Sequence, residues 1–258
     1  MRKRSRTCSY QRMLFGMPWD FWLIFIVLGV FLPWRGRQRI RKLLALPEVG
    51  GRDRIRLYFS TILFQWVLTG LIGWRAFSRG LSASELGLSA PWTPKILLIT
   101  FVGATVIALG HWLNLRRMAG MSHPSVELLR AMAARIFPRS GSELCFYLVL
   151  ALTAGVCEEF IFRGFVVTAM SRAGLSDWEV VVLSSLMFGL AHLYQGRGGS
   201  IGTGLLGVMF AAVRIAYYSL LPVMVWHAVL DVVAGFAGAR YLTSKRSNEP
   251  GISTGNQQ

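Results

Sequence analysis

Seven apolar runs separated by polar or basic stretches constrain this chain more than any other feature. They lie at about residues 21–32, 57–74, 96–113, 143–170, 178–193, 201–217 and 220–239. Runs of this kind are typical of helices that cross a bilayer, where backbone polar groups must be paired within the helix. Hydrophobic residues make up 53% of the chain and the mean hydropathy is +0.48, too apolar for an ordinary soluble domain. The sequence therefore predicts an all-α polytopic membrane bundle of about 7–8 helices.

The net charge of +16 indicates which partners to expect. The basic residues flank the apolar runs, and no nucleic-acid motif or phosphate-cradling loop is present. We therefore expect contacts with anionic lipid headgroups and no binding of nucleic acid.

Lysine and arginine residues also predict the orientation. If the last six runs are spans and residues 35–56 are cytoplasmic, the cytoplasmic segments hold 17 of these residues and the opposite segments hold 5. The cytoplasmic segments are then 35–56, 114–142, 194–200 and 240–258, and the opposite ones are 75–95, 171–177 and 214–219. The positive-inside rule predicts a cytoplasmic C-terminus. The first run stays ambiguous, because both its flanks are basic: it either spans or lies on the cytoplasmic face.

Three ionisable residues, Glu158, Glu159 and Arg163, interrupt the apolar run 143–170. Charged groups at bilayer depth are costly and commonly functional. Glu159 and Arg163 are four residues apart and share one helix face, so they can form an ion pair. Glu158 points about 100° away and lacks a local partner. One alternative is that the three groups form a buried cluster that only fixes helix packing.

Two further apolar runs carry histidine. His192 ends Phe188-Gly-Leu-Ala-His192, and His227 shares a helix face with Asp231. Buried separately, these groups and the glutamates would be left unsatisfied, whereas together they could surround a wet cavity. Carboxylates with imidazoles suit activation of water or binding of a divalent metal such as zinc. Cys157 is interpreted as a small packing residue.

These residues form three motifs that resemble those of a known family. Glu158-Glu159-x-x-x-Arg163, Phe188-x-x-x-His192 and His227-x-x-x-Asp231 are similar, in order and helix placement, to the motifs of the CPBP intramembrane proteases. This family, also called Abi, includes type II CAAX prenyl endopeptidases and bacteriocin-processing enzymes. The resemblance covers about residues 143–240 and implies a bundle of roughly eight helices that hydrolyses a peptide bond.

The resemblance also implies roles for the residues. Glu158 would be the general base, assisted by His192, while Glu159 and Arg163 support the site. His227 and Asp231 would stabilise the oxyanion. The family is described both as zinc-dependent, which would make His192, His227, Asp231 and Glu158 the metal ligands, and as using a glutamate-activated water. The last position is often Asn in the family, and an ionised Asp cannot donate a hydrogen bond.

The resulting organisation has four parts. We expect a basic N-terminal region with a short membrane-associated or spanning helix (1–56), accessory spans with an amphipathic segment at 125–137 (57–142), a catalytic core (143–240) and a disordered tail (241–258). The expected substrate is a peptide or membrane protein, which can be lipidated, and the expected location is the bacterial plasma membrane. Two alternatives remain: a proton or ion transporter, and a non-catalytic scaffold or bacteriocin-immunity protein.

Overall fold

Helices form at every apolar run, and several begin at residues that cap a helix. Thr93 and Ser140 each accept a hydrogen bond from a backbone N–H three residues ahead. Ser176 and Glu179 form a capping box. Such caps pair N–H groups that would otherwise be unsatisfied at the helix start.

The computed structural model describes residues 17–243, which form eight helices and no strand. The first comprises α2 (Trp19–Ile26), η1 (Val27–Phe31) and α3 (Leu32–Ala45). The next three helices are α4 (Gly51–Ser78), α5 (Pro94–Met118) and α6 (Pro124–Ile136). The fifth is one continuous helix made of α7 (Gly141–Glu159), η2 (Phe160–Val166) and α8 (Val167–Arg172). The last three are α9 (Asp177–Ala191), α10 (Gly196–Tyr217), which the short η3 (Leu193–Gln195) precedes, and α11 (Leu221–Leu242). The all-α prediction is confirmed. The predicted disordered tail lies, except for its first residues, outside the described residues.

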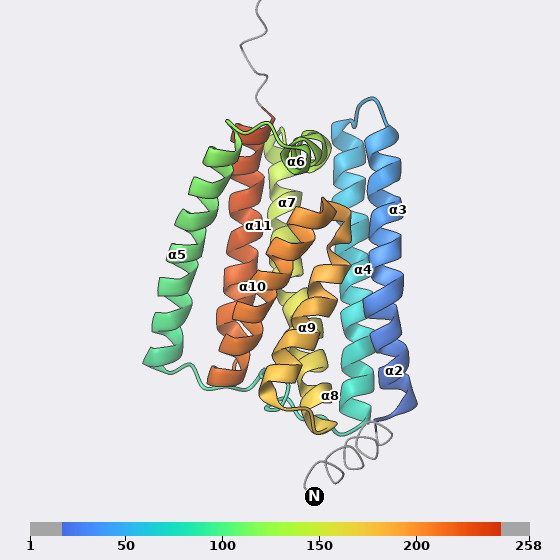
Figure 1. The fold of residues 1–258 in the computed structure, drawn as a ribbon, viewed down its shortest axis with the longest axis vertical. Coiled ribbons are helices and arrows are strands. Elements are labelled where there is room, and N and C mark those ends of the chain that lie inside the picture. The colour runs from blue at the N-terminus through green and yellow to red at the C-terminus, as the bar shows by residue number, and fades with distance from the viewer. Residues whose placement is uncertain (1–16, 244–258) are drawn as a thin grey trace, which may run out of the picture.

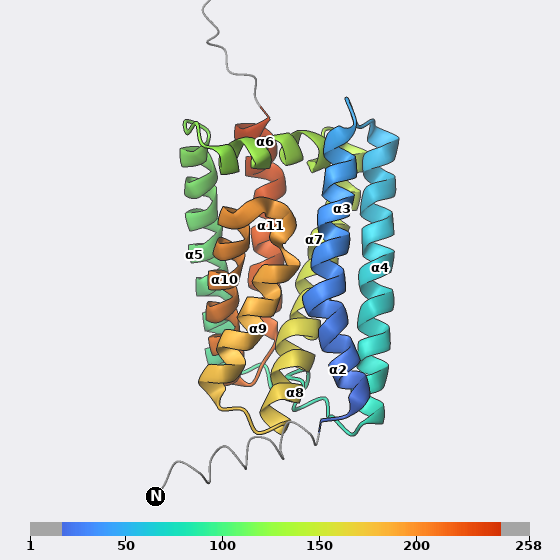
Figure 2. The same cartoon turned by 45° about the vertical axis from the view of Figure 1, so that its right-hand side comes forward.

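The long helices stand side by side, and α6 lies across one end of them (Figure 1). We call this end of the bundle the α6 end and the opposite one the α8 end. In the view turned by 45°, α6 runs across the tops of the other helices (Figure 2). Such a position suits the interfacial amphipathic helix predicted for 125–137. Within the bundle, α7 packs against both α4 and α11, while α5 packs on the outer side of α11.

Six of the helices are long and apolar enough to cross a membrane. They include Trp19–Ala45, which runs beside α4 along the length of the bundle (Figure 1). This position favours the spanning alternative for the first apolar run. By contrast, α9 has 15 residues, about 22 Å, and falls short of the hydrocarbon thickness. The turn from α9 to α10 therefore lies short of the α6 end (Figure 2).

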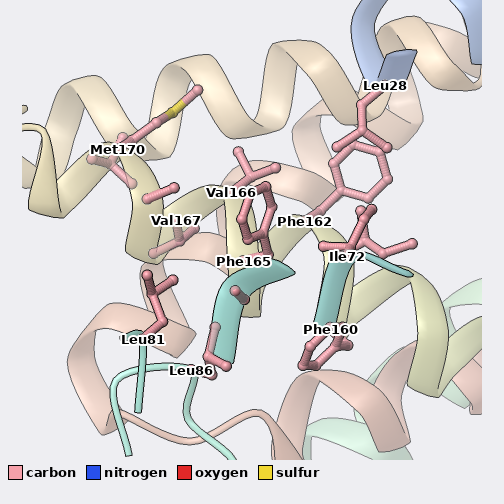
Figure 3. Packing of buried hydrophobic residues seen from close by; sticks show 14 of the residues in the cluster. Leu28, Ile72, Leu81, Leu86, Phe160, Phe162, Phe165, Val166, Val167 and Met170 are labelled. Carbon is pink, nitrogen blue, oxygen red and sulfur yellow. The ribbon is translucent and has the colours of Figure 1, made fainter. Parts of the chain in front are cut away.

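All seven residues of η2, from Phe160 to Val166, are buried. Phe162, Phe165 and Val166 form a cluster with Leu28 of η1 and Ile72 of α4, among others (Figure 3). The core therefore surrounds the chain directly after the paired glutamates and fixes its position.

Ion pairs connect separate segments of the chain at both ends of the bundle. At the α6 end, the Arg54 guanidinium donates to both oxygens of Glu143, at 2.7 and 3.2 Å, which ties α4 to α7. At the α8 end, Glu85 pairs with Arg172 and accepts hydrogen bonds from Ser82. These bonds to Ser82 and Arg172 stabilise the ionised carboxylate and lower the pKa of Glu85 to about 2.

Candidate active site

The paired glutamates at the end of α7 have different surroundings. Glu159 and Arg163 have no exposed side-chain surface, and Arg163 Nη1 donates to Glu159 Oε1 at 3.1 Å. The predicted ion pair is therefore confirmed. The Glu158 side chain is 21% exposed and points toward other helices. The two carboxylates thus occupy the separate positions that their spacing predicted.

A π-helical segment begins directly after Glu159. This segment is η2, and its seven residues include Arg163. Such widened turns are rare and often occur at functional sites. Nothing in the apolar pattern of 143–170 predicted it.

Glu159 has a second partner on another helix. His227 Nδ1 lies 2.7 Å from Glu159 Oε1, the oxygen that also accepts from Arg163. The carboxylate accepts here, so Nδ1 is the protonated nitrogen. Glu159 therefore links α7 to α11 and fixes the orientation of the His227 ring.

Glu158 faces three other helical segments. Gln65 Nε2 of α4 donates to Glu158 Oε1 at 2.7 Å. The other oxygen, Oε2, lies 3.6 Å from His192 Nε2 and 3.9 Å from His227 Nε2. This buried oxygen has no hydrogen-bond partner among the described residues. The predicted gathering of Glu158 with both histidines is therefore observed.

His192 reaches the site because α9 is short. It follows the last residue of α9, and its Nδ1 lies 2.8 Å from the carbonyl oxygen of Phe188. A carbonyl only accepts, so Nδ1 carries the hydrogen and Nε2 of the neutral ring has a free electron pair. That electron pair belongs to the nitrogen nearest Glu158.

Asp231 lies at the margin of the site. Its Oδ2 is 3.9 Å from His227 Nε2, and its side chain is 39% exposed. The shared helix face predicted for His227 and Asp231 is confirmed. Asp231 is more exposed than any other predicted site residue described above.

Two residues that contribute to the site had no role assigned to them from the sequence. Gln65 is the lone amide side chain in the run 57–74, which was the available signal. Phe188 was noted as part of a motif, but its ring lies 4.0 Å below the Arg163 guanidinium and also contacts His192 and His227. A cation on an aromatic face is stabilised, which helps to hold the buried arginine.

The two histidines resemble metal ligands in one respect, since each has its Nδ1 hydrogen-bonded and its Nε2 directed to the same point. However, among residues 17–243 no group of three or more His, Cys, Asp or Glu side chains is arranged to hold a metal ion. Zinc binding therefore stays a prediction.

The fold and these residues define a class: a membrane-embedded helical bundle with a buried carboxylate–imidazole site. Residues 139–233 match the family model of the type II CAAX prenyl endopeptidase Rce1-like proteins. The matched segment holds all three motifs and confirms the resemblance predicted from them. It does not include Gln65. No curated protein and no solved structure matches the chain.

Proposed function

We propose that this protein is an intramembrane endopeptidase that hydrolyses a peptide bond near the membrane surface with a water activated by Glu158 and His192. One observation carries the proposal. Glu158 has one oxygen held by Gln65, and its other oxygen is unpaired beside two imidazole nitrogens. An acceptor oxygen and an acceptor nitrogen 3.6 Å apart suit the two hydrogens of one water molecule.

The proposed reaction follows from these acceptors. A water donating to Glu158 Oε2 and His192 Nε2 has its lone pairs directed away from both. As its oxygen bonds to the carbonyl carbon of the substrate, a proton passes to Glu158, and the carbonyl π electrons move to the oxygen. Glu158 then returns this proton to the amine that leaves when the C–N bond breaks. The carboxylate thus ends the cycle ionised.

His227 is the proposed donor to the oxyanion. Its Nδ1 is bound to Glu159, and its Nε2 lies between Glu158 and Asp231. Nearby carboxylates stabilise an imidazolium, whose Nε2–H can donate to the developing negative charge. Asp231 supports His227 from the exposed side.

The setting of the site within a bundle of membrane-spanning helices supports a substrate that is associated with the membrane. We propose a peptide or membrane-protein substrate, including lipidated ones, in a bacterial plasma membrane, with anionic lipids bound by the basic helix ends. The charge bias of 17 to 5 supports a cytoplasmic α6 end.

Zinc dependence is tested separately, because Glu158, His192, His227 and Asp231 are the groups that would ligate it. If zinc supplied the Lewis acid, chelation should abolish cleavage, added zinc should restore it, and the purified protein should hold near-stoichiometric zinc. We expect full activity in a metal-free, chelator-treated preparation.

The central test uses Glu158→Gln, which keeps the shape of the side chain but removes the base. Membranes with wild-type protein should lose specific peptides or membrane proteins that the variant enriches in a pull-down read by mass spectrometry. Glu127→Gln on the exposed face of α6 is the matched control and should behave as wild type. Full cleavage by a folded Glu158→Gln protein would rule out the proposed function.

A further inference from the structure

Gln65 is the site residue that neither the motifs nor the family match includes. It lies in the middle of α4, a helix whose apolar run has no other amide. Its Nε2 donates to Glu158 Oε1 at 2.7 Å, and α4 packs along α7. A segment outside residues 139–233 therefore contacts the carboxylate to which we assign the role of base.

The orientation of the Gln65 amide is determined by its partner. A carboxylate oxygen only accepts, so the amide nitrogen and not the amide oxygen must face Glu158. The Gln65 Oε1 atom is buried and has no hydrogen-bond partner among the described residues. The bond to Glu158 is thus the one side-chain hydrogen bond observed for Gln65, so this amide has little to contribute to the fold beyond it.

A neutral donor is suited to this position. A carboxyl group can turn either oxygen toward a water, and a bond to Oε1 leaves Oε2 as the one facing His192 and His227. Lysine or arginine at residue 65 would also donate, but would form an ion pair that lowers the basicity of Glu158. An apolar residue would leave Oε1 without a partner.

We propose that Gln65 is a positioning residue for Glu158: it holds one carboxylate oxygen so that the other receives the proton of the attacking water. This inference rests on the proposed function. It adds to the proposed active site a residue of α4, which lies outside the matched segment 139–233.

The kinetic test compares Gln65→Met with Thr61→Val. Methionine keeps the length and volume of glutamine and removes the donor. Because a hydrogen bond to a charged group is lost, we expect kcat to fall about 10- to 100-fold while KM changes less than about twofold. Thr61 lies one turn earlier on α4 and donates to the Leu57 carbonyl of its own helix, so Thr61→Val should leave both constants unchanged. An unchanged kcat in Gln65→Met would overturn the proposal.

A second measurement does not depend on turnover. It compares the melting temperatures in detergent of Gln65→Met, Glu158→Met and the double variant with that of wild type. Each single change leaves a buried polar group unpaired, so the double variant should melt higher than the sum of the two shifts predicts. Additive shifts would show that the contact is absent, whatever the activity. If wild type cleaves no peptide and the coupling is present, the proposed function fails while the contact between Gln65 and Glu158 stands.

Discussion

At the scale of single residues, adjacent glutamates differ because their partners differ. Glu159 shares one oxygen between Arg163 and His227 and is fully buried. Glu158 binds a neutral amide and keeps an unpaired oxygen. A carboxylate fixed by a cation has a structural role, whereas one with a free oxygen can accept a proton. Divergent environments of this kind commonly separate the roles of paired carboxylates.

The Glu159–Arg163 pair gives the first residue-scale prediction. Arg163→Met should destabilise the bundle by about 3–5 kcal/mol, because it leaves a buried carboxylate without its cation. Glu159→Gln combined with Arg163→Met should recover part of that loss, since a neutral amide oxygen still accepts from His227. Thermal melting in detergent measures both. Equal losses in the single and double variants would show that Arg163 does not act through Glu159.

Asp231 gives the second residue-scale prediction. Because Asp231 is proposed to support the His227 imidazolium as an anion, Asp231→Asn, which has nearly the same shape but no charge, should lower kcat nearly as much as Asp231→Leu. Both changes should reduce kcat by about 10²–10³-fold, because the proposed donor to the oxyanion is weakened. The measurement compares the rates of wild type and the two folded variants on one peptide. An Asp231→Asn enzyme that keeps most of its activity would contradict the anionic role and assign this position a donor role, since asparagine carries a permanent N–H donor.

At the scale of elements, helix length and close helix contact bring the site together. Because α9 ends early, the turn that follows it lies short of the α6 end (Figure 2), and the His192 side chain at the start of this turn is buried. The α7–α11 contact brings Glu159 to His227, and Gly155 allows it. A Cβ atom at Gly155 would lie 2.7 Å from the Met224 carbonyl oxygen and 2.9 Å from Ala228. The two backbones are therefore as close as a residue without a side chain permits.

Gly155→Ala should accordingly lower both stability and activity. The added methyl group meets backbone, so α7 and α11 must separate, at a cost of about 1–3 kcal/mol. Separation also lengthens the contact between Glu159 and His227, so kcat should fall. Gly110→Ala on α5 is the control, because nothing lies within 4 Å of a Cβ there. Melting temperature and kcat of the two variants should differ, and wild-type behaviour of Gly155→Ala would contradict the proposed packing constraint.

The buried Arg54–Glu143 pair tests the α6 end independently of the site. Glu143→Gln should cost several kcal/mol, because it leaves the buried Arg54 guanidinium without its counter-charge. The activity of the protein that remains folded should not change, since this pair joins only the first turns of α4 and α7. A fall in kcat per folded molecule would show that the two regions are coupled.

At the scale of the whole molecule, the bundle sorts the loops into two groups. The segments 35–56, 114–142 and 240–243 lie at or near the α6 end, and the segments 75–95, 171–177 and 214–219 lie at the α8 end (Figure 1). These are the groups that the lysine and arginine distribution separated, apart from 194–200, whose turn lies short of the α6 end, and 244–258, which lie outside the described residues. Charge and topology are thus mutually consistent.

A pair of reporter fusions tests the orientation. A reporter that is active only outside the cytoplasm should stay silent at Gln258 and become active when inserted after Gly80, in the loop at the α8 end. The positive-inside bias is the physical reason. The reverse pattern of reporter activity would show that the protein has the opposite orientation in the membrane.

The sequence alone determined the fold class, the helix positions, and the residues Glu158, Glu159, Arg163, His192, His227 and Asp231 as one group. These follow from local rules, because apolar length sets spanning helices and a spacing of four sets a shared helix face. Only the tertiary structure decided that Gln65 holds Glu158, that Glu159 is shared with His227 and that the chain widens into η2. Gln65 and Glu158 are 93 residues apart, and no periodicity encodes which faces of two distant helices meet. That choice is made by packing, through contacts such as the one Gly155 permits between α7 and α11.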